Sequence, residues 1–495
     1  MAHAVRTAIR SAALNEQPRH ACHNFIAGRW EPADGCGTQA KRDPSSPSRT
    51  LAEVPASGPV DVARAAAAAE AAFSDWAASP APLRGAVLGS VADQLESRSA
   101  LLARTVSQET GKPIAESTGE VERAVSILRF FAGEGRRALG ERYQQETGGA
   151  VFTVRRPVGP VALITPWNFP IAIPVWKSAA ALAYGNTVVL KLASDASLSG
   201  LELARCFDAA RAPDGVLNVI TGSGSMCGPA LLRQPEIRAV SFTGSEGVGH
   251  SIRELAGERG IRAQLELGGH SPLIVMADAA LDRAVDGAFR GAFSSQGQKC
   301  TSTRRIYVQE EIADAFREAL LERIGAARLG HPLAADTEIG PLVNEQQMKL
   351  VLEAIEDAKR EGARVLAGGH ALPEFGYLVE PTLLEGLSDR AMISREEVFG
   401  PVVAIHVVAN LDEALTRANE TRFGLSAAIY TSDLASAVRF TREMHAGVLH
   451  VNSPTAGAEP HVPFGGLKAS GWGPHEQGRA AIEFYTDLVT VYEDL

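Results

Sequence analysis

Two successive alternations of short apolar strands with helical stretches organise the chain from residue 157 onward. In the first, "VGPVALIT", "NTVVLK", "GVLNVI", "IRAVSFTG" and "RAQLELGG" have the pattern of buried strands, and helical stretches over about 171–184, 197–210 and 246–257 separate them. Strands that alternate with helices of this length form parallel β-α units, which predicts a doubly wound α/β sheet. Such sheets bind ligands at the carboxyl ends of their strands.

The second alternation begins at residue 272 with "PLIVM" and continues through "RRIYVQ" and "PVVAIHVV", with helices expected from 281 and from 311. It predicts a second α/β domain, and no low-complexity linker separates it from the first. We place the boundary near 268–271. Residues 60–139, in contrast, have the pattern of three amphipathic helices.

The last fifteen residues, "AIEFYTDLVTVYEDL", have the pattern of a strand that is remote from any predicted partner. A terminal strand of this kind often completes a sheet elsewhere, including in another subunit. Together with the β-rich run "VFTVRRP" it predicts an oligomerisation arm, made by 140–156 and 482–495. We therefore expect a homodimer or a homotetramer.

Composition excludes several classes of protein. The formal net charge of −10 argues against nucleic acid as the main partner, because phosphate backbones need a basic face. The five cysteines are thinly spread, odd in number and never in C-x-x-C spacing, so we expect neither a disulfide framework nor a metal site, and a reducing, cytoplasmic location. No apolar run reaches the roughly eighteen residues of a transmembrane helix, so we expect no membrane partner. The N-terminus lacks the apolar core of a secretory signal, which favours a loose extension or a docking helix over a transit peptide.

Four short motifs fall where a doubly wound fold holds its ligands: "PWNFP" (166–170), "SFTGSEGVG" (241–249), "LELGG" (265–269) and "GQKC" (297–300). Each has a structural and a chemical interpretation. Gly244 and Ser245 open a helix, and they form either an ordinary tight turn or a pyrophosphate site at the helix N-terminus. Asn168, between two prolines, is either a turn-former or a rigid oxyanion donor.

The other two motifs carry a carboxylate and a thiol. Glu266 lies at the end of an apolar strand, where it is either solvated at a sheet edge or a general base whose pKa an apolar site raises. Cys300 is flanked by small, polar and basic residues, unlike a packed core thiol. It is either an inert thiol or a reactive one, since an adjacent lysine such as Lys299, or a helix N-terminus, lowers the pKa of a thiol and raises its thiolate fraction.

The runs "NFIAGRW", "PWNFP", "FTGS", "LELGG", "GQKC", "EEVFGP" and "PFGGLKASG" follow one another in an order and at a spacing that resemble the aldehyde dehydrogenase superfamily, from about Asn24 to about Tyr492. The resemblance implies a Rossmann-type doubly wound dinucleotide-binding domain over 1–139 and 157–267, with 1–20 as an N-terminal extension. It also implies an α/β catalytic domain over 268–475 that carries a nucleophilic cysteine.

The resemblance further implies a mechanism. The Cys300 thiolate attacks the aldehyde carbon, and the Asn168 amide with the backbone N–H of Cys300 holds the oxyanion. Hydride passes to a nicotinamide, which leaves a thioester, and Glu266 activates the water that releases the acid. The presence of Glu266 argues against an acylating branch that transfers the acyl group to coenzyme A. The presence of all three residues argues against a catalytically silent structural protein.

The cofactor implied by the resemblance is NAD or NADP. Its expected contacts are Thr165, Pro166 and Trp167 beside the dinucleotide, Lys191 at the adenosine ribose, Gly244 and Ser245 at the pyrophosphate, and Glu397, Phe399 and Gln347 at the nicotinamide ribose. In "KLAS" the neutral Ser194 replaces the glutamate that many members use to bind the ribose hydroxyls. We therefore expect NADP to be used at least as well as NAD.

Within the superfamily, "PWNFPIAIPVWK", "GQKCT" and "AGEGRR" look closest to bacterial 2-oxoglutarate-semialdehyde (2,5-dioxopentanoate) dehydrogenases. A carboxylate-bearing semialdehyde is the leading substrate class, and an uncharged aliphatic or aromatic aldehyde is the alternative. Position 176 is Trp where succinate-semialdehyde enzymes often carry an Arg, so Lys299, Arg156 or His461 is expected to supply the positive charge. The expected substrate pocket consists of Phe169, Trp176, Lys299, Thr301 and Phe464, the aromatic members of which are also compatible with plain core packing.

Overall fold

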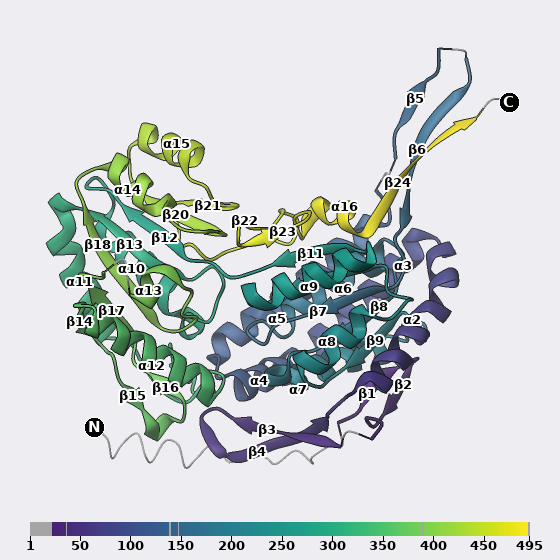
Figure 1. Cartoon of the computed structure of the whole chain (residues 1–495), viewed down its shortest axis with the longest axis horizontal. Helices are drawn as coiled ribbons and strands as arrows, with labels where there is room; N and C mark the ends of the chain where they lie inside the picture. Colours follow the sequence, from purple (N-terminus) through teal and green to yellow (C-terminus); the bar gives the residue numbers. More distant parts are fainter. Residues whose placement is uncertain (1–21, 36, 138–139, 147, 389–390, 494–495) are drawn as a thin grey trace.

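The structure, a computed structural model, describes residues 22–35, 37–137, 140–146, 148–388 and 391–493. Two α/β units lie side by side, and a β arm projects from one end of the molecule (Figure 1). The expected N-terminal extension over 1–20 lies outside the described residues. Within the described ranges, no helix is long and apolar enough to cross a membrane.

The first sheet has eight strands in the order β2-β1-β9-β8-β7-β10-β11-β23, and the five from β9 to β11 are parallel. The chain winds outward from β7 in both directions, so the carboxyl ends of β7 and β10 flank the point at which a doubly wound sheet opens a ligand crevice. The strands are β1 Asn24–Ile26, β2 Arg29–Glu31, β7 Val161–Ile164, β8 Val188–Lys191, β9 Leu217–Ile220, β10 Ala239–Thr243, β11 Arg262–Glu266 and β23 Gly471–Trp472.

Helices cover both faces of this sheet. Val161 and Leu163 of β7 pack into one apolar cluster, and Ala162 and Ile164 pack into another, because successive side chains of a strand point to opposite faces. The covering helices are α2 Pro59–Ala78, α3 Ala81–Ser97, α4 Ser99–Thr110, α5 Ile114–Glu134, α6 Ala172–Ala183, α7 Ser197–Ala209, α8 Gly224–Leu232 and α9 Glu246–Arg259, with the 3₁₀ turn η1 Ser194–Ala196. Residues 60–139 thus contain four helices and not three, since the non-helical backbone of Arg98 (φ −105°, ψ 10°) separates α3 from α4.

The second sheet has seven strands in the order β14-β17-β18-β13-β12-β20-β21, and all pairs but β14–β17 are parallel. Its strands are β12 Ser271–Val275, β13 Thr303–Gln309, β14 Arg364–Ala367, β17 Thr382–Glu385, β18 Val402–Val408, β20 Ser426–Tyr430 and β21 Val448–Val451. Its helices are α10 Leu281–Phe293, α11 Ala313–Gly325, α12 Glu345–Arg360, α13 Met392–Arg395, α14 Leu411–Asn419 and α15 Leu434–Glu443, with the 3₁₀ turns η2 Ser294–Gly297, η3 Glu310–Ile312 and η4 Pro373–Phe375.

Short strand pairs connect these parts. They are β3 Thr38–Asp43 with β4 Ser46–Pro55, β15 Ala371–Leu372 with β16 Leu378–Val379, and β19 Phe423–Gly424 with β22 Leu467–Lys468. Soon after β22 the chain returns to the first sheet, where Trp472 and Gly471 pair with Leu265 and Glu266 at the end of β11. The segment expected to belong to the second domain up to residue 475 therefore contributes an edge strand to the first.

The arm consists of β5 Arg142–Gln144, β6 Ala150–Pro157 and β24 Thr486–Glu493, which together form a separate sheet (Figure 1). The C-terminal strand β24 has its partner in the same chain: it is antiparallel to β6 over eight residue pairs. Residues 482–485, which we expected to begin this strand, form the short helix α16 (Ile482–Tyr485) after the 3₁₀ turn η5 (Gly478–Ala481). They do so because Phe484 and Tyr485 are buried in the core of the first unit. The role of the arm in assembly stays a prediction.

Candidate active site

A cavity of about 250 Å³ opens beside Cys300, between the two α/β units. Its walls come from α5, α6, the ends of β10 and β11, the loop around Cys300, and segments near 454–464. The lining residues are Arg123, Phe169, Ala172, Ile173, Trp176, Thr243, Glu266, Leu267, Arg290, Ser294, Lys299, Cys300, Thr301, Pro454, Ala456, Gly457, Ala458 and Phe464.

The loop that presents Cys300 has a strained backbone. Ser295 and Gln296 have positive φ values of 51° and 56°, which is costly for residues other than glycine and persists only where contacts enforce it. The Ser295 N–H donates to Glu116 Oε1 at 2.8 Å, and Gln296 Nε2 donates to the Gly111 carbonyl at 3.0 Å. These bonds to the first unit hold the loop, so the position of the thiol depends on both units.

The thiol of Cys300 is not activated in the way that the sequence suggested. Burial raises its pKa to about 12, and the carboxylates of Glu397 and Glu266 act in the same direction. The ammonium of Lys299 lies 3.9 Å from Glu116 Oε2, so part of its charge is offset by that carboxylate. Burial thus outweighs the attraction between the Cys300 thiolate and the Lys299 ammonium, and the lowered pKa expected from the sequence is not found. A base has to remove the thiol proton during the reaction.

The Asn168 side chain points toward this loop. Its Nδ2 donates to the Gln298 carbonyl at 2.9 Å, two residues before Cys300, and an amide nitrogen has a second N–H to offer. Its Oδ1 is buried and has no hydrogen-bond partner among the described residues. Asn168 is thus held beside the cysteine with a donor to spare, which is the geometry that an oxyanion site requires.

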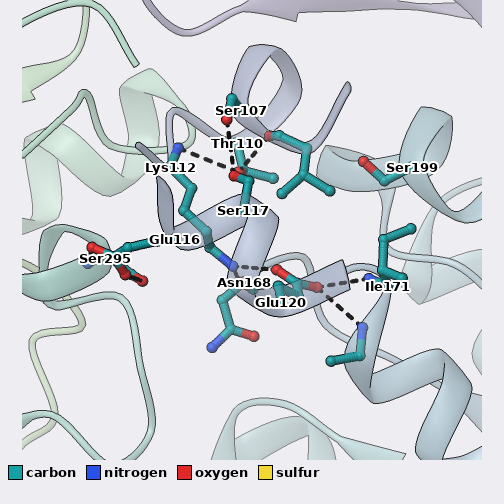
Figure 2. A network of polar contacts seen from close by, with 12 residues as sticks. Ser107, Thr110, Lys112, Glu116, Ser117, Glu120, Asn168, Ile171, Ser199 and Ser295 are labelled. Atoms are coloured by element: carbon teal, nitrogen blue, oxygen red, sulfur yellow. Dashed lines mark hydrogen bonds and ion pairs between the residues drawn. The ribbon is translucent and has the colours of Figure 1, made fainter. Parts of the chain in front are cut away.

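Helix α5 supports the turn that carries Asn168, as Figure 2 shows. Lys112 Nζ donates to the Asn168 carbonyl at 2.7 Å and forms a buried ion pair with Glu120. Glu120 Oε1 in turn accepts hydrogen bonds from the N–H groups of Ile171 and Ala172, at 2.8 and 3.1 Å. The sequence analysis missed this pair, because neither residue lies in one of the motifs.

Glu266 ends β11 and lines the cavity with a side chain that is 4% exposed. Burial raises its pKa well above the ordinary value, and the neighbouring Glu476 adds to this, while Lys177 acts against it. Lys177 forms a buried ion pair with Glu476 and donates to Ser241 Oγ at 2.6 Å. The expectation of an apolar, pKa-raising environment for Glu266 is confirmed in direction, and its two charged neighbours were missed. The position of Lys177 within the apolar run "PVWKSAAA" was the one feature of the sequence that could have indicated a buried charge.

The expected dinucleotide contacts of the first unit lie together at the carboxyl edge of its sheet. Thr165, Pro166 and Trp167 follow β7, Lys191 ends β8, and Gly244 and Ser245 follow β10. Ser245 is the N-cap of α9, and its side chain makes no capping hydrogen bond, so the N–H groups of the first turn are available to an anion. A Cβ atom on Gly244 would lie 2.4 Å from the Phe242 ring, so glycine is required there.

The second unit supplies the opposite side of the crevice. Trp167 and Phe399 meet edge to face with ring centroids 5.4 Å apart, and Gln347 Nε2 donates to the Phe399 carbonyl at 3.0 Å. Glu397 Oε1 accepts from the Gly269 N–H at 3.2 Å, and burial raises the pKa of Glu397 to about 7. Through Trp167 and Gly269 these residues contact segments that follow β7 and β11 of the first unit, and their contact with the nicotinamide ribose stays a prediction.

The polar groups of the protein at this crevice are of the kinds that bind a dinucleotide. The hydroxyl oxygens of Thr165 and Thr243 are buried without a hydrogen-bond partner among the described residues. Burial lowers the pKa of Lys191 to about 8, so a cation is held there with little solvent. Unpaired hydroxyls, a buried cation and an open helix N-terminus are the groups that bind ribose and phosphate.

Ser194 lies in η1, just after β8. Its Oγ donates to the Gly222 carbonyl at 3.0 Å, and its own carbonyl accepts a hydrogen bond from Lys41. Lys41 also lies 3.7 Å from Asp195. A phosphate would therefore have to compete with Gly222 for the serine proton, which the sequence did not reveal.

All five expected pocket residues (Phe169, Trp176, Lys299, Thr301 and Phe464) line the cavity. Arg156 and His461, in contrast, do not: both are exposed, and Arg156 lies on β6 of the arm, opposite Asp487. Their assignment as sources of positive charge is wrong. The sequence analysis missed two cations that do line the cavity, Arg123 on α5 and Arg290 on α10, because only the packing of these helices determines which residues face the pocket.

Comparison with known proteins agrees with this geometry. The aldehyde dehydrogenase family matches residues 30–491, so the chain belongs to that family. It is 40% identical over 474 residues to the alpha-ketoglutaric semialdehyde dehydrogenase of Bacillus subtilis, covering 95% of this chain and 97% of that protein. It is 39% identical to the 2,5-dioxopentanoate dehydrogenase of Saccharolobus solfataricus (91% and 95% covered) and 38% identical to mouse retinaldehyde dehydrogenase 3 (94% and 92% covered).

Solved structures are equally similar in fold. An NADP-dependent enzyme of E. coli superposes with a TM-score of 0.93 at 35% identity, covering 96% of this chain and 98% of that one. An NAD-dependent aldehyde dehydrogenase of Sinorhizobium meliloti gives 0.94 at 35% identity, with 96% and 95% covered. The chain is thus an NAD(P)-dependent aldehyde dehydrogenase, and the expected fold class, enzyme class and cofactor type are confirmed.

Proposed function

We propose that the enzyme oxidises a small semialdehyde that carries a carboxylate, and releases the corresponding dicarboxylic acid. The observation that carries this proposal is the set of cations around the cavity: Arg123, Arg290 and Lys299 line it, against Glu266 as the one acid among the described lining residues. A positive rim with low-dielectric walls attracts anions and raises their local concentration. Two of the relatives are named for 2,5-dioxopentanoate and alpha-ketoglutaric semialdehyde, which are small anionic aldehydes.

The size of the cavity supports a small substrate. Its volume of about 250 Å³ lies below the roughly 300–1,000 Å³ of pockets that take drug-sized ligands. A five-carbon aldehyde fits such a volume more readily than a retinoid does. An uncharged aldehyde remains the second candidate, since Trp176 and Phe464 form an aromatic wall with ring centroids 5.9 Å apart.

The roles of the three central residues follow from their surroundings. The Cys300 thiol loses its proton to a neighbouring base and attacks the aldehyde carbon. The Asn168 amide and the backbone N–H of Cys300 stabilise the resulting oxyanion. A bound nicotinamide dinucleotide supplies the hydride acceptor. Glu266, which is buried and interacts electrostatically with the Glu476–Lys177 ion pair, takes a proton from the water that hydrolyses the thioester and passes it toward that pair.

The cofactor-binding roles are part of the same proposal. Thr165, Pro166 and Trp167 would lie beside the dinucleotide, and Lys191 and Ser194 would hold the adenosine ribose. Gly244 and Ser245 would hold the pyrophosphate, and Gln347, Glu397 and Phe399 the nicotinamide ribose. We further infer a cytoplasmic enzyme that assembles through its arm into a homodimer or homotetramer.

Incubation of the protein with a panel of aldehydes tests the proposal. NADH or NADPH formation should be seen at 340 nm without coenzyme A, and kcat/KM should be higher for 5-oxopentanoate and 2,5-dioxopentanoate than for pentanal. Product formation that requires coenzyme A would instead mean an acylating enzyme. Equal kcat/KM for the anionic and the uncharged aldehydes would reject the substrate class.

A further inference from the structure

The three cations that line the cavity differ in how far their charge is already neutralised. Arg290 lies 3.6 Å from Asp286, and its side chain is 64% exposed, so water and a carboxylate screen it. Lys299 is 12% exposed and lies 3.9 Å from Glu116. Arg123 has no carboxylate within 4.0 Å in the part of the chain that the structure describes.

Arg123 is also poorly supplied with hydrogen bonds for a guanidinium, which has five N–H donors. Its Nη2 donates to Gln477 Oε1 at 3.3 Å, while its Nε is buried and has no partner among the described residues. Burial lowers its pKa, and the carboxylates of Glu459 and Glu120 raise it only through longer-range attraction. A partly buried cation without an anion is costly, and a bound carboxylate relieves that cost.

The position of Arg123 suits the far end of a short substrate. Its guanidinium lies over the Trp176 ring at 5.8 Å from the centroid, and Trp176 packs against Phe464. All three line the same cavity as Cys300. An aldehyde held at Cys300 would have its carbon chain along the aromatic wall and its charged end toward Arg123. Trp176 carries no positive charge, and Arg123 of α5, whose guanidinium lies over the Trp176 ring, would supply it instead.

We propose that Arg123 is the specificity residue that binds the distal carboxylate of the substrate. The proposal rests on the function proposed above and names the group that recognises the anion. A guanidinium presents two parallel N–H donors to a carboxylate, so the contact fixes the direction of the substrate as well as attracting it. Arg290 and Lys299 then contribute to the general attraction of anions, and not to this contact.

The test compares kcat/KM for 5-oxopentanoate with kcat/KM for pentanal, two aldehydes of the same chain length that differ in charge. For Arg123→Gln the ratio of the two should fall by about 10- to 100-fold, mostly through a higher KM for the anion, as expected for the loss of one charge-assisted contact. Arg123→Lys should recover part of the ratio, because it keeps the charge and loses the two-point contact. The same order should hold for 2,5-dioxopentanoate.

Two further variants serve as controls. Arg129→Gln removes an exposed arginine of the same helix, paired with Glu96 and remote from the cavity, and should leave the ratio unchanged. Arg290→Gln should lower the ratio less than Arg123→Gln does. Turnover of pentanal by Arg123→Gln shows that the variant is folded.

The outcomes separate the two proposals. If the wild-type enzyme prefers 5-oxopentanoate and Arg123→Gln retains that preference, the assignment of Arg123 is wrong and the substrate class stands. If Arg290→Gln removes the preference and Arg123→Gln does not, the carboxylate is bound at the mouth of the cavity. If the wild-type enzyme shows no preference, the proposed substrate class fails, and the role of Arg123 fails with it.

Discussion

Lys112 Nζ lies 2.7 Å from the backbone carbonyl oxygen of Asn168, and this contact joins the proposed oxyanion donor to the buried ion pair that Lys112, just before α5, forms with Glu120 of α5. Glu120, the partner of Lys112, also accepts the N–H groups of Ile171 and Ala172. The turn that presents the Asn168 amide is therefore held by charged groups that take no part in the chemistry.

Glu120→Gln should reduce both stability and turnover. The change leaves the buried ammonium of Lys112 without its counter-charge, which costs about 3–5 kcal/mol when a buried pair loses one member. Thermal unfolding should shift to lower temperature, and kcat should fall, because the turn that presents the Asn168 amide loses a contact that positions it. Glu122→Gln, an exposed position on the same helix, is the matched control and should behave like wild type. Normal kcat in Glu120→Gln would mean that the turn is rigid without the pair.

Glu266→Gln should separate the two halves of the reaction. If Glu266 activates only the hydrolytic water, the variant should give a rapid burst of NADH or NADPH and then stall as an acyl-enzyme. Intact-mass spectrometry should find the acyl group on Cys300, and no adduct should form in Cys300→Ala, which should still bind the dinucleotide. Absence of the burst in Glu266→Gln would show that this carboxylate acts earlier, as the base that takes the thiol proton.

The pH dependence follows from the same groups. Burial raises the pKa of Cys300 to about 12 and raises that of Glu266 well above its ordinary value, and in the proposed mechanism both residues react in their deprotonated forms. Activity should therefore increase from pH 6 toward pH 9.

Stability should change with pH in the opposite sense. The Glu266 carboxyl, whose folded-state pKa is raised, keeps its proton to higher pH than it does in the unfolded chain. The fold therefore loses stability as pH rises above the unfolded-state pKa. Glu266→Gln should consequently melt at a higher temperature than wild type at pH 8, with a smaller difference at pH 5. Equal differences at both pH values would mean that Glu266 is ionised in the folded protein.

The sequence predicted those features that short stretches determine. Each buried strand of the first sheet is a contiguous apolar run, and the ligand-binding motifs follow these strands directly, so parallel topology alone places Asn168, Ser245 and Glu266 at one edge. The resemblance carried by seven ordered motifs added the chemistry. The same reasoning failed for Arg98, whose local backbone breaks a helix that the apolar pattern continues through.

Features that depend on tertiary packing could not be predicted from the sequence. Lys177 and Glu476 are 299 residues apart in the chain and meet only through the fold. Arg123 faces the cavity because of the way α5 packs against α6, and it belongs to none of the sequence motifs. The pKa of Cys300 is raised mainly by the burial of its loop, an effect that the neighbouring residues in the sequence do not reveal. The sequence placed the tail and the run that forms β6 in one arm, but the pairing of the two strands within the same chain and its register come only from the fold.

Removal of the last ten residues tests the arm. The deletion eliminates the whole of β24, the strand that pairs with β6, and leaves the edge of β6 unpaired. The exposed side chains of Leu488 and Tyr492 on β24 are apolar surface that a second copy of the chain could cover. We expect the truncated protein to be monomeric or aggregated by multi-angle light scattering, while the full chain is a dimer or tetramer. A stable, active monomer from the truncation would rule out assembly through β24.

We expect cofactor choice to depend on the residue at position 194. In a doubly wound fold an acidic residue after the second strand binds the ribose hydroxyls and repels a 2′-phosphate, and here that position is the neutral Ser194. Lys191, a cation held in a site that lowers its pKa to about 8, ends the preceding strand. Without a glutamate at 194 nothing there repels the 2′-phosphate, and Lys191 can attract it. Together these two effects should favour NADP by about 1–3 kcal/mol, roughly tenfold or more, relative to a chain with glutamate at 194. The hydrogen bond from Ser194 Oγ to the Gly222 carbonyl limits this preference for NADP, because the hydroxyl proton is already donated.

We expect kcat/KM for NADP to equal or exceed that for NAD, and Ser194→Glu to depress the NADP value much more than the NAD value. Ser90→Glu, which adds the same charge at an exposed site on α3, should change neither. If Ser194→Glu leaves the ratio of the two cofactors as it was, the ribose is recognised by other groups, of which Lys41, bonded to the Ser194 carbonyl, is the nearest cation to test next.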